Sequence, residues 1–127
     1  MSDETADGAT DEAIRIGYEM LDMARQGRSE LLAYVDAGAP VNLTGPSGDT
    51  LVMLAAYHGH AELVRGLVER GADVNRRNDR DQSPLAGAVF KGYDEVAAAL
   101  VAAGADPDAG SPTAREAAAI FGRELPG

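Results

Sequence analysis

Residues of the same kind recur along this chain at a fixed distance of 33 positions. The paired positions are Thr50 and Ser83, Gly59 and Gly92, Gly71 and Gly104, Asp73 and Asp106, and Asn42 and Asn75. A period of this length is typical of proteins built from stacked helical units, because one unit is too thin to bury its own apolar face. The period therefore predicts an all-α solenoid of stacked helix-turn-helix units.

One complete unit lies between residues 48 and 75. Its first helix is expected to follow Thr50, a suitable N-cap, and to break at Gly59. Its second helix is expected to end at Gly71, which suits a left-handed cap. The second helix has one apolar stripe, made of Leu63, Val64, Leu67 and Val68. These spacings are helical, so we expect a helix pair and almost no sheet.

This unit resembles the ankyrin repeat, whose core reads roughly T-P-L-H-x-A-A-x-x-G-H and is followed by an apolar helix and G-A-D-V-N. The residues in register are Thr50, Ala55, Ala56, Gly59, His60, Leu63, Val64, Leu67, Val68 and the segment Gly71–Asn75. Leu51 and Met53 stand where the family has proline and histidine. The family's hydrogen bonding through that histidine is therefore in doubt here. The resemblance implies an ankyrin-repeat fold and gives His60 a structural role in the turn.

The period divides residues 10–127 into repeats at about 10–42, 43–75, 76–108 and 109–127. The middle two are full, and the outer two are divergent capping repeats. Residues 1–9 are acidic and small, so a disordered tail is expected before an N-cap at Thr10. The first helix is expected to bury Ile14, Tyr18 and Leu21. Segments 43–49 and 76–82 should form projecting turns, where Asp81 takes the glycine position of Gly48.

Composition and charge exclude several classes of function. The chain has no cysteine, so a disulfide framework and a thiolate nucleophile are excluded. Its formal net charge of −10 disfavours nucleic acid and anionic membranes and favours a partner with a basic surface. No apolar run is long enough to span a membrane, and the first twelve residues do not resemble a secretory signal. A cytoplasmic location is therefore expected.

No catalytic, metal-binding or cofactor-binding pattern is found. The two histidines, His58 and His60, flank a helix break at Gly59 and have no nucleophile linked to them by a motif. A metal site would need a carboxylate from elsewhere in the chain. Glycine-rich nucleotide-binding motifs are absent from the sequence. We therefore expect a protein that is not an enzyme and that needs no cofactor.

The ankyrin resemblance implies a partner-binding surface at the turn tips and at the outward edge of each first helix. By register, this surface comprises Pro46, Ser47, Asp49, Leu54, Tyr57, His58, Asp79, Arg80, Gln82, Gly87, Phe90 and Lys91. Leu54, Tyr57 and Phe90 are the expected apolar anchors, although each could instead pack against an adjoining helix or turn.

The resemblance therefore implies a monomeric module that binds another protein through its concave face. One alternative is a specific inhibitor or regulator of an enzyme or toxin, which would use the same surface. A second alternative, from another class, is a small hydrolase, which would require a carboxylate to converge with His58.

Overall fold

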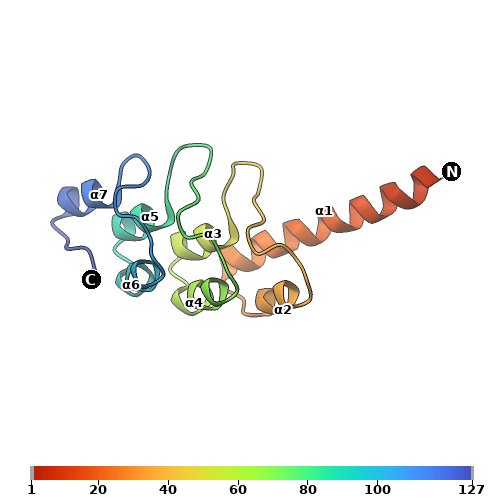
Figure 1. Cartoon of the computed structure of the whole chain (residues 1–127), viewed down its shortest axis with the longest axis horizontal. Helices are drawn as coiled ribbons and strands as arrows, with labels where there is room; N and C mark the ends of the chain where they lie inside the picture. Colours follow the sequence, from red (N-terminus) through yellow and green to blue (C-terminus); the bar gives the residue numbers. More distant parts are fainter. Residues whose placement is uncertain (1, 127) are drawn as a thin grey trace.

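The computed structural model describes the backbone of residues 2–126 and the side chains of residues 11–126. These residues form seven helices: α1 (Ser2–Gln26), α2 (Glu30–Asp36), α3 (Leu51–Tyr57), α4 (Ala61–Glu69), α5 (Pro84–Lys91), α6 (Asp94–Ala102) and α7 (Ala114–Phe121). Helices α1, α3, α5 and α7 form one row, and α2, α4 and α6 form a second row beside it (Figure 1). The expected all-α solenoid is confirmed. Within the described residues, strand pairing is limited to an isolated bridge between Thr44 and Thr50.

Helix α1 begins earlier than the sequence predicts. Its backbone is helical from Ser2, whereas a disordered tail over residues 1–9 and an N-cap at Thr10 were expected. Residue 1 lies outside the described part of the chain. The segment contains no proline, and its single glycine is only a modest helix breaker, so its sequence is compatible with helix. The N-terminal half of α1 projects beyond the stacked helices (Figure 1).

Side-chain caps fix where three helices of the first row begin. The hydroxyl of Thr50 accepts a hydrogen bond from the backbone N–H of Met53 at 3.1 Å, and Ser83 accepts one from Ala86 at the same distance. Thr113 and Glu116 form a reciprocal capping box at the start of α7. The predicted N-caps at Thr50 and Ser83 are therefore confirmed. Because each cap satisfies otherwise unpaired N–H groups, the helices begin at equivalent places in successive units.

Helix α3 forms the centre of the core. Residues 51–56 of this helix are all buried, since α1 packs on one side of it, α5 on the other and α4 beneath. Ala55 and Ala56 have no exposed surface, as a thin stacking face requires. The second row contributes the predicted stripe, in which Leu63, Val64 and Leu67 are buried.

Successive units are linked through side-chain hydrogen bonds rather than through a sheet. The side-chain oxygen of Asn42 accepts from the N–H of Asp73 at 2.8 Å, and that of Asn75 accepts from Asp106 at 2.7 Å. His60 Nε2 lies 2.8 Å from the carbonyl oxygen of Arg25, which can only accept, so this nitrogen donates. The structural role expected for His60 is therefore observed.

The turns between units project as fingers from one side of the stack (Figure 1). The N–H of Asp79 donates to the carbonyl of Ser47 at 3.0 Å, and that of Ser111 donates to Asp81 at 2.8 Å. These bonds tie each finger to the next. Asp81 has a φ of +61°, as its place at a glycine position predicts.

Apolar side chains are exposed at both ends of the stack, and at the N-terminal end this differs from the sequence prediction. Leu21 is buried as expected, but Ile14 and Tyr18 are 53% and 54% exposed. Both border a cavity between α1 and residues 43–46, because α1 is the first helix of its row and packs against α3 on one side only. At the other end α7 buries Ala114, Ala117 and Ala118 and leaves Ile120 and Phe121 exposed. None of the helices in the described region is long and apolar enough to cross a membrane.

The core analysis yields a stability prediction. Ala56→Leu should destabilise the fold by about 1–3 kcal/mol, because a buried stacking face has no room for three further carbons. Ala98→Leu makes the same change at an exposed position of α6 and serves as the control. Urea unfolding monitored by circular dichroism measures both. Equal unfolding free energies for the two variants would contradict the assigned packing.

Candidate functional site

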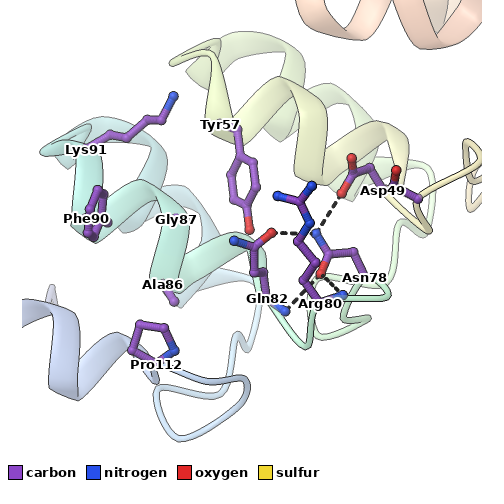
Figure 2. Close-up of a pocket in the computed structure, with 11 residues that line it drawn as sticks. Asp49, Tyr57, Asn78, Arg80, Gln82, Ala86, Gly87, Phe90, Lys91 and Pro112 are labelled. Atoms are coloured by element: carbon purple, nitrogen blue, oxygen red, sulfur yellow. Dashed lines mark hydrogen bonds between the residues drawn. The ribbon is translucent and has the colours of Figure 1, made fainter.

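A hollow of about 440 Å³ opens between α3, α5 and the fingers. Figure 2 shows side chains from three successive units converging on it. We refer to it as the concave hollow. Its lining consists of Ser47, Asp49, Tyr57, Asn78, Arg80, Gln82, Ala86, Gly87, Phe90, Lys91 and Pro112.

Asn78 organises the finger on one side of the hollow. Its Nδ2 donates to Oδ1 of Asp49 and to Oε1 of Gln82, both at 2.8 Å. Its Oδ1 accepts from the backbone N–H groups of Arg80 and Gln82. Four hydrogen bonds therefore hold one amide, fix the finger tip and link it to the preceding finger through Asp49 (Figure 2).

Tyr57 spans the gap between α3 and α5. Its hydroxyl donates to the carbonyl oxygen of Ser83 at 3.2 Å. A Cβ atom built at Gly87 would lie 1.9 Å from Cε1 of the ring, so only glycine leaves room for the tyrosine in this position. Burial, together with the nearby negative charge of Asp49, raises the pKa of Tyr57 well above its usual range.

Phe90 presents the largest exposed apolar surface in the hollow. Its side chain is 54% exposed. The ring of Phe90 nevertheless packs against that of Phe121, and the two rings meet edge to face with centroids 5.0 Å apart. Arg123 donates to the carbonyls of Val89 and Phe90 at 2.6 and 3.0 Å. The final unit thus fixes an aromatic side chain that belongs to the unit before it.

Seven side chains that the register assigned to the partner-binding surface line the concave hollow: Ser47, Asp49, Tyr57, Arg80, Gln82, Phe90 and Lys91. Gly87, which the register also assigned to this surface, lines it as well. The hollow therefore brings together residues from two fingers and two first-row helices, as the register predicted. The other four residues lie elsewhere.

Leu54 is the clearest error of the sequence analysis. It was expected as an exposed anchor, but it is only 5% exposed because α3 is enclosed by its neighbours. His58 is exposed and outside the hollow, with Nδ1 directed at the carbonyl of Leu54 at 2.9 Å. Pro46 borders a separate apolar cavity beside α1, and Asp79 is exposed on its finger.

The sequence analysis missed three residues of the lining. Asn78 could have been recognised from the sequence, because the side chain of an asparagine in a turn commonly forms a hydrogen bond to the backbone two residues further on. The sequence gives no comparable indication for Ala86 and Pro112. Pro112 reaches the hollow from the last finger, and its position depends on how the fourth unit packs.

The hollow lacks the pairing that the hydrolase alternative requires, namely a carboxylate beside His58. His58 lies outside the hollow, and its Nδ1 faces a backbone carbonyl. Among the residues that the structure describes, no cluster of three or more histidine and acidic side chains could hold a metal ion. The arrangement is a hollow with an aromatic floor and polar walls.

Comparisons with known proteins agree with this architecture. A family description of ankyrin repeats, in three copies, matches residues 20–111, which is well over half of the chain. A protein of Pseudomonas aeruginosa that is named as an ankyrin repeat protein is 49% identical over 49 residues. That match covers 38% of this chain and 29% of the relative, so the chain spans less than a third of the relative's length.

The raised pKa of Tyr57 predicts a loss of stability at alkaline pH. As pH rises above about 10, the ordinary tyrosine value, the unfolded state loses a proton that the folded state keeps, so the free energy of unfolding falls. Tyr57→Phe lacks this ionisation and should show a shallower decline. Urea unfolding of both proteins at pH 9 and pH 11 tests the prediction, and parallel declines would contradict it.

Proposed function

The chain belongs to the ankyrin-repeat family, and we propose that it binds another protein through the concave hollow and the neighbouring finger tips. Ankyrin repeats generally serve as protein-interaction modules. The residues predicted from the sequence, apart from the buried Leu54, remain the proposed contact set. We further propose that the protein is a cytoplasmic monomer without enzymatic activity or cofactor.

The observation that carries this proposal is the exposed ring of Phe90 on a prearranged support. An aromatic side chain held by Phe121 loses little conformational freedom when a partner covers it, so its apolar surface can contribute fully to binding. Tyr57 adds a second ring whose position is set by Gly87 and Ser83. Aromatic residues in such settings are the usual centres of protein interfaces.

Net charge supports a role in the encounter with the partner. At −10, the molecule should attract a partner whose overall surface is basic, and this attraction acts before contact. Salt screens it over a distance of about 8 Å at physiological ionic strength. Association with such a partner should therefore slow as salt is raised.

A specific inhibitor or regulator of an enzyme or toxin would use the same hollow, so it remains a special case of this proposal. Loss of the captured partner's activity on addition of the protein would identify it. The hydrolase alternative has no support in the geometry, because His58 is outside the hollow.

The proposal predicts which substitutions weaken binding. Affinity purification from the native host, with bound proteins identified by mass spectrometry, supplies the partner. Phe90→Ala should then raise the dissociation constant about thirtyfold, which corresponds to about 2 kcal/mol for a buried aromatic anchor. The loss should arise mainly through faster dissociation.

Two controls separate the hollow from other surfaces. Ile120→Ala removes an exposed apolar side chain from α7 outside the hollow, and Glu69→Ala changes the second row. Both should bind as wild type, with circular dichroism showing that every variant is folded. If Glu69→Ala abolishes binding and Phe90→Ala does not, the partner uses the convex face and the proposal fails.

A further inference from the structure

The concave hollow carries a local charge opposite to that of the whole molecule. The chain has 21 acidic and 11 basic residues. The lining nevertheless contains two basic side chains, Arg80 and Lys91, and one acidic side chain, Asp49. The carboxylate of Asp49 already accepts a hydrogen bond from Asn78 at 2.8 Å, inside the network that fixes the finger. The hollow is thus a positively charged spot on an acidic protein.

Neither Arg80 nor Lys91 has an acidic partner among the side chains that the structure describes. Of the ion pairs formed by the described residues, none includes either side chain. The neighbouring Arg77 differs, since it pairs with Asp81 at 3.1 Å, and Arg123 is bound to backbone carbonyls. Both cations of the hollow are exposed and available to a ligand.

The two cations lie on either side of Tyr57. In Figure 2, Arg80 lies on one side of Tyr57, on the finger, and Lys91 lies on the other side, beside Phe90 at the end of α5. Tyr57 lies between them, and Phe90 lies next to Lys91, farther from Arg80. A ligand that fills the hollow with an apolar group therefore brings its neighbouring atoms towards a positive charge on either side.

We propose that the partner inserts a peptide segment in which an aromatic or large aliphatic side chain is flanked by aspartate or glutamate. The apolar side chain would cover Phe90 and Tyr57, and the carboxylates would pair with Arg80 and Lys91. Arginine can hold a carboxylate through two parallel hydrogen bonds, and lysine supplies a compact charge. This inference rests on the proposed function, because it specifies the ligand of the same hollow.

Charge also favours a peptide over a nucleic acid. A polyanion long enough to leave the hollow would meet the acidic surface of a chain with net charge −10. One or two carboxylates on an otherwise neutral or basic partner would avoid this repulsion. The long-range preference for a basic partner and the local preference for an acidic segment are thus compatible.

Two short peptides test the inference. Both are acetylated and amidated at their ends, and both place one phenylalanine at the centre, flanked by two aspartates in one peptide and by two lysines in the other. Each is titrated into the full-length ¹⁵N-labelled protein. The acidic peptide should shift the amide signals of Gly87, Phe90 and Lys91, and it should bind several-fold more tightly than the basic peptide.

Charge-neutralising variants provide the matched comparison. Arg80→Gln and Lys91→Gln should each raise the dissociation constant of the acidic peptide by about threefold or more. Arg76→Gln removes the same charge from an exposed position outside the hollow and should leave the affinity unchanged. The side chain of Arg80 makes no hydrogen bond to the described residues, so its replacement should not disturb the finger.

Three results would overturn the inference: equal or tighter binding of the basic peptide, no shifts at the hollow with the acidic peptide at millimolar concentration, or equal losses for Arg76→Gln and Arg80→Gln. These outcomes are separable from a failure of the proposed function. If Phe90→Ala still weakens binding of the natural partner, the hollow does bind a protein. Only the inferred preference of the hollow for an acidic segment is then wrong.

Discussion

The close approach of the first-row helices is the interaction on which the rest of this structure depends. Ala55 and Ala56 have no exposed surface, so α3 can lie against its neighbours with no intervening bulk. No single helix pair could bury its apolar face alone, and stability is therefore shared between neighbouring units. Hydrogen bonds from the side chains of Asn42, Asn75 and His60 join successive units along the same direction. Apolar stacking and polar contacts therefore impose the same spacing between units.

That spacing creates the candidate site, which does not belong to any one unit. Tyr57 comes from one unit, Gly87 and Phe90 come from the next, and Phe121 and Arg123 of the last unit hold Phe90 in place. The fingers are tied to each other by backbone hydrogen bonds between Ser47 and Asp79 and between Asp81 and Ser111. A substitution that alters stacking should consequently change recognition as well as stability.

Charge acts on two length scales in this molecule. The formal charge of −10 is spread over the whole chain and governs the approach of a partner. Arg80 and Lys91 act only at contact, on either side of Tyr57. A partner could satisfy both by presenting a generally basic surface that carries a local acidic segment. The net charge can be read from composition alone. The local effect of Arg80 and Lys91 can be recognised only when the structure shows which cations lack an acidic neighbour.

The sequence by itself determined the repeat, the helix starts at Thr50 and Ser83, the positive φ at Asp81 and most of the lining of the hollow, because caps, glycines and a 33-residue period act locally or by register. Only the tertiary structure decided what covers each side chain. Leu54 is buried because α3 is enclosed, and Ile14 and Tyr18 are exposed because α1 is the first helix of its row and packs against α3 on one side only. Register predicts the direction of a side chain, but burial depends on the neighbouring elements that stacking brings near.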